Sequence, residues 1–351
     1  MEYTVLTPID SDQWHYYLRK ANAFDFYHSC QYHAIENSDE PLLFLYECGE
    51  DFVAIPLIKR AIEDSCYFDL TSAYGYVGPI SNRTFNDGDS AFLDNMREAF
   101  LEFMDHERIV SLFSRLHPII NQDQIINKIG GSYCNGQTVA IDLDLPIDEQ
   151  RKVYRRDHSR AIKILHEKGF YIKNESTSSG VETFVPIYHE NMRRVNASET
   201  YFFDETYFNN LLSAKEFSVY LLLVYYEDVA VAGGIFSFTR DIVQVHLLST
   251  ATEYLRYSPT KMLIDEISQI ARKRNMRYLH LGGGFGGKND SLFAWKAGFS
   301  DWHLNFNTWR YIHNPKVYNE LIEANQLDQV PNTDFFPLYR STSSKKLVPQ
   351  S

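Results

Sequence analysis

Residues 281–288 read Leu-Gly-Gly-Gly-Phe-Gly-Gly-Lys, and together with the next eleven, Asn-Asp-Ser-Leu-Phe-Ala-Trp-Lys-Ala-Gly-Phe299, they decide how the rest of the chain is interpreted. Glycine lets a backbone approach a ligand closely, and a helix that starts after such a loop offers amide groups to an anion. The alternative is that these glycines have no ligand and only form a turn that needs positive φ angles. The glycine-rich run and the lysine that closely follows it favour a functional loop.

Lys296 is the residue of this stretch with the clearest chemistry. It stands in a predicted short helix, residues 291–297, among leucine, phenylalanine, alanine and tryptophan. Its side chain either extends to solvent along this apolar surface or is held in a pocket. A lysine in a pocket could stabilise the oxyanion that forms when an amine attacks an ester or thioester. The local sequence leaves both interpretations open.

A dinucleotide-binding loop is a third interpretation of the glycines. Gly282, Gly284 and Gly287 satisfy the pattern G-x-G-x-x-G between a predicted strand and a predicted helix. That pattern belongs in a first βαβ unit, whereas here it stands near the end of the sequence and no regular βαβ alternation surrounds it. The context therefore argues against a nicotinamide-dependent enzyme.

Length, charge and cysteine usage limit the class of protein. The 351 residues, 44% of them hydrophobic, suit two ordinary domains. The net charge of −12 argues against nucleic-acid binding driven by the overall charge of the protein, although it does not exclude binding by a local basic groove. Four scattered cysteines without a CxxC pair suggest neither a disulfide framework nor a metal site. The start of the sequence does not resemble a signal peptide and no run is apolar enough to span a membrane, so we expect a cytoplasmic protein.

Periodicity predicts mixed α/β or α+β architecture rather than a doubly wound sheet. A hairpin is expected at residues 41–59, and a helix at 90–107 that Asp89 would cap. One continuous basic helix is expected at 151–168, after a change in composition near residue 145. The remaining predicted helices cover residues 180–195, 204–212, 259–274 and 315–325, and the remaining strands cover 66–70, 110–116, 138–143, 170–173, 218–226, 229–238, 242–249, 278–281 and 304–312.

Other candidate ligand contacts are basic or aromatic. The helix at 151–168 includes Arg156 and Arg160, which suit a phosphate-bearing ligand or form an ordinary solvated face. Met192-Arg-Arg194 and Tyr201-Phe-Phe203 are likewise either ligand contacts or ordinary surface and core residues. His246 lies in an apolar strand and is interpreted as a hydrogen-bonded core histidine. Since no motif for a nucleophile is found, direct transfer without a covalent enzyme intermediate fits best.

Five segments together resemble one family. They are Tyr74-Gly-Tyr-Val-Gly-Pro79, Arg115-Leu-His-Pro-Ile119, Tyr188-His-Glu-Asn-Met-Arg-Arg194 with Tyr201-Phe-Phe203, the Gly-rich loop and the helix with Lys296. Their order is similar to that of the FemABX-like acyltransferases of the GNAT superfamily, over residues 31–312. The resemblance implies two GNAT-like domains, each a mixed, mostly antiparallel sheet packed by helices. The first would comprise residues 1–145 and be completed by 315–351, and the second would comprise 146–314.

The resemblance also implies site residues. Lys296 would be the catalytic residue that steadies the tetrahedral transition state. The candidate substrate-binding residues are Tyr74, Tyr76, Arg115, Arg156, Arg160, Tyr188, Arg193, Arg194, Tyr201, Gly283, Gly284, Phe285 and Trp295. No tightly bound cofactor is expected, because the family uses acyl-CoA or aminoacyl-tRNA as donor substrate. The coenzyme loop departs from the family pattern, since residues 256–261 carry proline and lysine in place of two glycines, and Ser258, Thr260 and Lys261 are the candidate phosphate contacts there.

We therefore expect an acyltransferase that forms an amide on an amino group of a cell-envelope precursor, such as a nucleotide-linked amino sugar or a precursor peptide. The expected partners are a small-molecule or nucleotide-linked glycan acceptor and, for an aminoacyl donor, tRNA. A catalytically inactive GNAT-like module that binds a glycan precursor or a protein partner is the alternative.

Overall fold

The computed structural model describes residues 2–36, 39–86, 89–325 and 335–341. The chain divides into two compact units, unit 1 (Met1–Cys134 and Phe306–Ser351) and unit 2 (Asn135–Asn305). In each unit one strand pair is parallel and the other pairs between described strands are antiparallel. This confirms the predicted fold class. The division cuts through two strands, β7 and β13, whereas the limits predicted from the sequence, after residues 145 and 314, lie beyond their ends.

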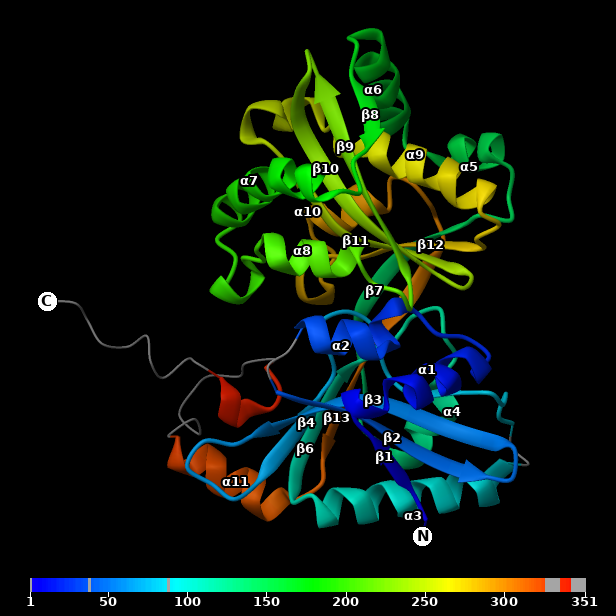
Figure 1. Ribbon diagram of the computed structural model, residues 1–351, viewed down its shortest axis with the longest axis vertical. Helices are drawn as coiled ribbons and strands as arrows, with labels where there is room; N and C mark the ends of the chain where they lie inside the picture. Colours follow the sequence, from blue (N-terminus) through cyan, green and yellow to red (C-terminus); the bar gives the residue numbers. More distant parts are fainter. Residues whose placement is uncertain (1, 37–38, 87–88, 326–334, 342–351) are drawn as a thin grey trace, which may run out of the picture. The chain divides into compact units, whose positions relative to one another are not determined.

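Unit 1 has the strand order β1-β2-β3-β4-β6-β13, with β5 paired to β3 and with β4 and β6 parallel (Figure 1). Its strands are β1 (Thr4–Leu6), β2 (Glu40–Cys48), β3 (Asp51–Ala61), β4 (Phe68–Thr71), β5 (Ile80–Ser81), β6 (Ile109–Arg115) and β13 (His303–Ile312). Its helices are α1 (Ser11–Lys20), α2 (Cys30–Glu36), α3 (Ser90–His106), α4 (Asp123–Ile129) and α11 (Pro315–Ala324). The predicted hairpin is confirmed as β2 and β3, whereas α1, α2 and α4 lie in segments for which no helix is predicted.

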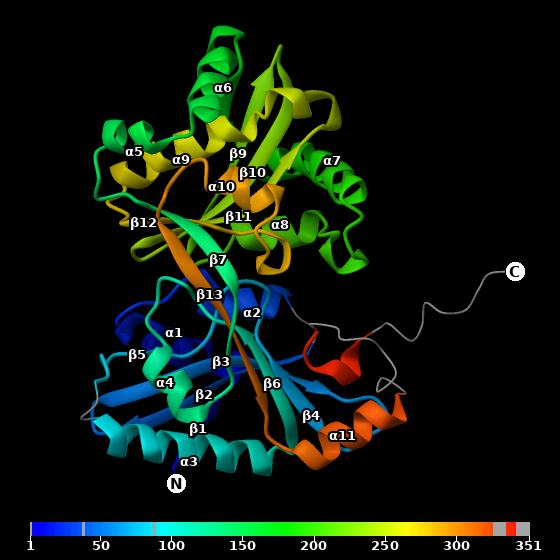
Figure 2. The same cartoon turned by 180° about the vertical axis from the view of Figure 1, so that it is seen from behind.

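Side chains of β2 alternate between two cores, as the pleat of a strand requires. Phe44 lies in a cluster with Phe100 of α3 and Trp309 of β13. Leu43 and Leu45 lie in a second cluster, which Trp14 and Leu18 of α1 complete. Helix α3 and helix α1 therefore cover opposite faces of the sheet, as both views show (Figures 1 and 2). Because both faces are covered, β2 reads as a continuous apolar run rather than as an alternating one.

Unit 2 has the strand order β7-β12-β11-β10-β9-β8, in which β11 and β12 are parallel. Its strands are β7 (Ser132–Asp142), β8 (Tyr171–Asn174), β9 (Ser218–Tyr226), β10 (Val229–Thr239), β11 (Ile242–Thr250) and β12 (Tyr278–Gly283). Its helices are α5 (Ile147–Val153), α6 (Arg156–Glu167), α7 (Ser178–Arg194), α8 (Glu205–Leu212), α9 (Thr260–Lys273) and α10 (Ser291–Lys296). Helices α7 and α8 cover one face of the sheet and α9 covers the other (Figure 2). No helix in the described ranges is long and apolar enough to cross a membrane.

The predicted continuous helix at 151–168 is wrong, because the chain forms two helices, α5 and α6. Tyr154 and Arg155 between them have extended backbone, with ψ of 133° and 137°. Tertiary contacts hold this break: the Tyr154 hydroxyl donates to Asp265 Oδ1 at 3.2 Å, and the Arg155 amide donates to the Gly298 carbonyl at 2.8 Å. These partners are more than 100 residues away in the sequence, so helical periodicity could not reveal them.

The predicted cap of α3 is also wrong. Asp89 occupies the N-cap position, but its carboxylate makes no capping hydrogen bond to the helix. It accepts a hydrogen bond from the Asn86 amide at 2.7 Å and pairs with Arg83. The guanidinium, which comes from outside the helix, competes successfully for the carboxylate, because a charge-assisted pair is stronger than a neutral amide bond.

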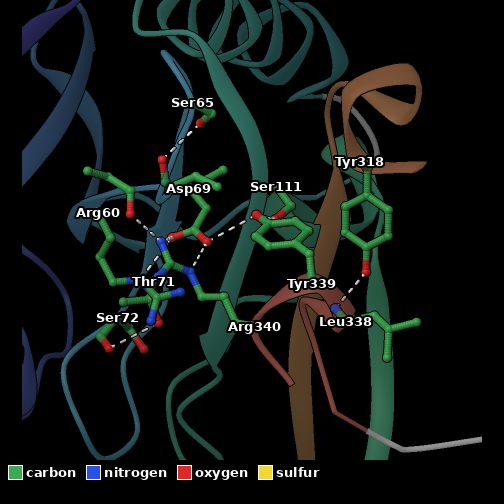
Figure 3. Close-up of polar contacts among 12 residues, drawn as sticks. Arg60, Ser65, Asp69, Thr71, Ser72, Ser111, Tyr318, Leu338, Tyr339 and Arg340 are labelled. Atoms are coloured by element: carbon green, nitrogen blue, oxygen red, sulfur yellow. Dashed lines mark hydrogen bonds and ion pairs between the residues drawn. The ribbon is translucent and has the colours of Figure 1, made fainter. Parts of the chain in front are cut away.

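A buried carboxylate in unit 1 binds Tyr339 and Arg340, two residues from the C-terminal part of the sequence (Figure 3). Asp69 of β4 is fully buried and lies 2.8 Å from Arg60 Nε of β3. From the other side it accepts hydrogen bonds from the Tyr339 hydroxyl at 3.0 Å and from Arg340. Tyr339 also contacts Ser111 of β6 at 2.8 Å, and burial raises its pKa well above the usual value. Residues near the end of the sequence thus complete the polar core of the first unit.

Replacing Asp69 measures how much this cluster contributes to the stability of unit 1. We expect Asp69→Ala to lower the free energy of unfolding of unit 1 by about 3–5 kcal/mol, because two guanidinium groups then lose their buried counter-charge. Urea unfolding at pH 7 measures the change, and limited proteolysis near Arg340 reports release of the segment. The control is Asp94→Ala, which removes an exposed ion pair with Lys128 and should leave the unfolding midpoint in place. Equal urea unfolding midpoints for the two variants would contradict the proposal that Asp69 stabilises this part of unit 1.

Candidate active site

Strands β11 and β12 separate soon after they meet. Their parallel pairing covers Ile242–Gln244 against Tyr278–His280. Beyond it, β12 stays paired with β7 through Gly282 and Gly283, and β11 stays paired with β10, but the two strands no longer pair with each other. We call the diverging ends, residues 245–250 and 281–283, the strand fork. In a parallel sheet, ligands bind beyond the carboxyl ends of strands where neighbours diverge, so the fork is the natural place for a site.

The Gly-rich loop starts on the β12 arm of the fork and is held by one side chain. Asp290 Oδ1 accepts the Phe293 amide at 2.8 Å and so caps α10, while its Oδ2 accepts the Phe285 amide at 2.9 Å. Burial opposes ionisation of this carboxyl, but the backbone hydrogen bonds and nearby Lys296 hold its pKa below the usual value. Asp290 is absent from the predicted site residues, although an aspartate one position before a helix is a recognisable capping signal.

Two glycines of the loop are required for different reasons. A Cβ on Gly284 would lie 2.1 Å from the Lys288 carbonyl oxygen and 2.4 Å from Asp290 Oδ1, so a side chain has no room. At Gly286 nothing lies within 4 Å, but φ is +62°, which L-residues adopt at a cost. The loop is therefore a tight turn with a fixed shape, and it presents Phe285, whose surface is 79% exposed.

Lys296 turns inward rather than toward solvent. Its Nζ donates a hydrogen bond to the Gly283 carbonyl oxygen at 2.7 Å, at the end of β12. Burial of the ammonium group lowers the pKa of Lys296 to about 8, against the opposing influence of Asp290, although the residue as a whole keeps some exposed surface. A desolvated ammonium at the end of a strand can donate a strong, charge-assisted hydrogen bond to an oxygen that gains negative charge.

The predicted phosphate contacts lie at the start of α9 and face protein partners. Ser258 Oγ accepts a hydrogen bond from Trp295 Nε1 at 3.4 Å, which joins α9 to α10. Lys261 is buried, with its Nζ 3.4 Å from Asp157 Oδ2 of α6. The Lys261 and Met262 amides donate to the Ser258 and Pro259 carbonyls, and Thr260 is buried. The first turn of α9 thus satisfies much of its own hydrogen bonding.

The predicted basic residues of α6 lie on its exposed side. Arg155 is held by Asp157, whose pKa this ion pair lowers strongly. Arg156 and Arg160 are exposed, stand one helical turn apart, and make no ion pair with any residue that the structure describes. They form a small cationic face to which an anionic ligand has access.

On the opposite side of the sheet, α7 supplies the remaining candidates of unit 2. The buried Tyr188 hydroxyl donates to the Tyr201 carbonyl at 2.5 Å, so it holds the segment between α7 and α8. Arg194 NH1 lies 3.5 Å from the Thr250 carbonyl oxygen, at the end of the β11 arm. Arg193 is exposed and Tyr201 is half-buried.

Three predicted residues belong to unit 1. The Arg115 guanidinium lies 5.7 Å from the centre of the Tyr74 ring, and the Tyr32 hydroxyl donates to the Tyr74 carbonyl at 2.8 Å. The Tyr76 ring meets Phe306 edge-on at 5.6 Å. Within this unit Arg115 therefore packs on Tyr74, and Tyr76 packs on Phe306. In unit 2, Gly283, Gly284, Phe285, Trp295 and Lys296 lie at or next to the strand fork.

Comparison with known proteins identifies the second unit. Residues 149–296, from α5 to Lys296, match the model of the acetyltransferase (GNAT) domain. These residues are a GNAT domain. Its last residue is Lys296, and the stretch includes the strand fork and the Gly-rich loop. A comparison with curated protein sequences gives no match.

Solved structures share the fold of the whole chain. FemX matches 91% of this chain and 99% of its own at 12% identity, with a TM-score of 0.71. A protein of unknown function from Bacteroides thetaiotaomicron matches 89% of this chain and 99% of its own at 10% identity, with a TM-score of 0.59. The C-terminal domain of a putative lysylphosphatidylglycerol synthetase from Agrobacterium fabrum matches 91% and 95% at 11% identity, with a TM-score of 0.56. At these identities the likeness shows a common fold, in which the GNAT domain forms the second unit.

Substituting Gly284 and Gly286 one at a time distinguishes the effect of a steric clash from the effect of backbone strain in the Gly-rich loop. We expect Gly284→Ala to displace the loop, break the hydrogen bond from Phe285 to Asp290 and lower the free energy of unfolding by about 1–3 kcal/mol. Gly286→Ala should cost only about 1 kcal/mol, because it strains one φ angle without a clash. Hydrogen exchange of residues 284–290 checks this: exchange should rise markedly for Gly284→Ala only. The same exchange pattern in both variants would contradict the steric argument.

Proposed function

We propose that the chain is an acyltransferase that forms an amide on an amino group of a cell-envelope precursor. The observation that carries the proposal is the inward-turned Lys296, whose ammonium lies 2.7 Å from the Gly283 carbonyl oxygen at the end of β12. A buried cation aimed at the edge of a strand fork is the arrangement that stabilises a developing oxyanion. Its place inside a GNAT domain supports acyl transfer as the reaction.

In the proposed reaction, the nitrogen of the acceptor amine attacks the carbonyl carbon of the donor's ester or thioester. A C–N bond forms and the carbonyl oxygen becomes an oxyanion. The Lys296 ammonium shifts part of its hydrogen bonding from Gly283 to this oxyanion and so lowers the barrier. Collapse of the intermediate breaks the bond to the leaving oxygen or sulfur, and the proton that the amine nitrogen loses ends on the leaving group. No covalent enzyme intermediate is needed.

The donor is proposed to be acyl-CoA or aminoacyl-tRNA. Much of the hydrogen bonding at the start of α9 is already used within the protein, with Lys261 facing Asp157 and the first amides bonded to nearby carbonyls. A coenzyme pyrophosphate would have to compete for these groups, which favours the aminoacyl ester of the two donors. In either case the exposed cations Arg156 and Arg160 are proposed to contact donor phosphate.

The acceptor is proposed to be a nucleotide-linked amino sugar or a precursor peptide. The chain shares its fold with FemX and with a putative lysylphosphatidylglycerol synthetase, which supports an envelope component as acceptor. Tyr201, Arg193 and Arg194 beside α7, the exposed Phe285 and half-buried Trp295 are proposed to bind substrate within unit 2. In unit 1, Tyr74, Tyr76 and Arg115 are proposed as substrate contacts. The buried Tyr188 would act by holding Tyr201 in place.

Donor consumption tests the proposal directly. The purified chain is incubated with acetyl-CoA or with charged tRNA, each in the presence of nucleotide-linked amino sugars or precursor peptides. Mass spectrometry of the acceptor then detects the mass added by an acyl or aminoacyl group. Formation of a new amide with either donor supports the proposal. Failure of every donor and acceptor pair, with a correctly folded protein, would overturn it.

Lys296 has a matched control in Lys288, an exposed residue that directly follows the Gly-rich loop. We expect Lys296→Ala to lower kcat by about 10²–10³-fold with the fold intact, which is the usual effect of removing one oxyanion donor. Lys288→Ala removes an exposed lysine eight positions earlier and should change kcat less than about twofold, as expected of a solvated side chain. Steady-state kinetics and circular dichroism check both variants. Equal kcat values for Lys296→Ala and the unaltered chain would remove the proposed role.

The pKa of Lys296 predicts the direction in which kcat changes with pH. Because the protonated amine is the active form in this mechanism, kcat at saturating substrate should fall as pH rises through about 8. Arginine stays protonated throughout this range, so in Lys296→Arg the alkaline fall should disappear even if kcat is lower overall. The measurement is kcat between pH 6 and 10. A rise in kcat through pH 8 that depends on Lys296 would instead indicate that the neutral amine acts as a base.

A further inference from the structure

His246 is the extra residue of a β-bulge. In the pairing of β10 with β11, Phe236 faces Val245 and Ile235 faces Leu247, so His246 between them faces no residue of β10. The bulge lies two positions beyond Gln244, the last residue of β11 that pairs with β12. Bulges redirect a side chain and locally end regular pairing, and they are frequent beside active sites. The geometry therefore places a histidine on the β11 arm of the strand fork.

The side chain of His246 contacts a phenol. The Tyr207 hydroxyl of α8 lies 2.8 Å from His246 Nε2, and the Tyr207 ring stacks on Phe203 at 3.9 Å. Tyr207 and His246 keep 7% and 8% of their surface, whereas Phe208 and Leu211 on the same helix keep none. The pair is thus buried but, unlike Phe208 and Leu211, keeps a small exposed surface.

The pair and Lys296 lie on opposite arms of the fork. Gln244 of β11 and His280 of β12 form the last pair between the two strands. His246 lies two residues beyond Gln244, and Gly283 lies three residues beyond His280. At about 3.3 Å per residue, these positions are roughly 7 and 10 Å along their strands from the last shared pair. Tyr207 approaches from the face covered by α7 and α8, and Trp295 next to Lys296 is bonded to Ser258 at the start of α9, on the other face. An acyl group bound at Lys296 would have its attacking amine on the side of Tyr207.

We propose that Tyr207 is a catalytic proton-transfer residue and that His246 positions it and takes up its proton. This inference rests on the proposed amide formation. After attack, an N–H proton of the tetrahedral intermediate passes to the Tyr207 oxygen while the phenolic proton passes to His246 Nε2. As the C–O or C–S bond breaks, Tyr207 gives a proton to the leaving group and regains one from the imidazolium. The C–N bond is kept, one proton has moved from nitrogen to the leaving group, and both side chains return to their starting state.

The environment of His246 suits a short-lived proton acceptor. Burial lowers the pKa of His246 to about 3, so the imidazole is neutral in the resting protein and Nε2 accepts the phenol proton when Nδ1 carries the imidazole proton. Burial makes the imidazolium form unfavourable, so in the proposed relay His246 holds the phenol proton only while the tetrahedral intermediate exists. The charge would therefore exist only between attack and departure of the leaving group.

Three variants test the relay. Tyr207→Phe removes the transferable proton and should lower kcat by about 10²-fold or more, with the KM for the acceptor within about threefold, as expected for a general acid–base group. His246→Gln can still hydrogen-bond to Tyr207 but cannot take up a proton, so kcat should fall and the solvent deuterium isotope effect on kcat should change. Tyr154→Phe, which removes another buried hydroxyl bonded to Asp265, is the control and should keep kcat within about twofold.

The readouts separate a catalytic role from a structural one. If Tyr207→Phe fails to fold, 3-fluorotyrosine at position 207 keeps the shape but makes the phenol more acidic, and a relay then shifts the pH profile of kcat. Unchanged kcat and isotope effect in Tyr207→Phe and His246→Gln, with turnover by the unaltered chain, would overturn the relay alone. Absence of any transfer by the unaltered chain would overturn the proposed function and this inference together.

Discussion

The parallel pairing of β11 with β12 ends after three residues, and the rest of the candidate site depends on that divergence. Past His280, β12 keeps β7 as its partner on the other side but no longer pairs with β11, and β11 keeps β10 through a bulge at His246. A sheet that stayed regular would bury both strand ends in backbone hydrogen bonds. Because the strands part, side chains from both faces of the sheet come to the same edge. Lys296 reaches it from α10, and Tyr207 and His246 reach it from α8 and β11.

Desolvation then sets the chemistry of the groups at the fork. The same burial that lowers the pKa of Lys296 to about 8 keeps His246 neutral with a pKa of about 3. Near neutral pH the Lys296 amine is mostly protonated, since Asp290 offsets part of the cost of burial. His246 has the Tyr207 phenol as its neighbour at Nε2, and burial alone sets the direction of its pKa change. One cation and one neutral acceptor in a partly dry site is the combination that amide formation uses.

Unit 1 is completed by a chain segment that is remote in sequence. The carboxylate of Asp69 brings together Arg60, Tyr339 and Arg340, although more than 270 residues separate it from the last of these. A buried carboxylate with two guanidinium groups is stabilising only when all partners are present. Residues that follow the GNAT domain in the sequence therefore take part in the buried polar cluster of the first unit.

Local sequence determined the elements and the lysine. Apolar runs and the turn residues between them predicted the hairpin of β2 and β3, and local sequence signals also predicted helices α7 to α10 and the mixed sheet. Lys296 and the Gly-rich loop could be singled out because glycine and an isolated lysine are conspicuous among apolar residues. The order of five motifs added the GNAT-like fold, which the domain match and the shared folds bear out.

Tertiary structure alone decided which way these groups point and what they touch. The inward turn of Lys296 depends on the Gly283 carbonyl, and the break between α5 and α6 depends on Asp265 and Gly298. The bulge at His246 is invisible in a sequence because it is a difference in register between two strands, and Tyr207 stands 39 residues away from its partner. Sequence patterns record which residues prefer burial or a given backbone conformation. They do not record pairing between distant segments, and at this fork that pairing places the cation and the phenol on opposite arms.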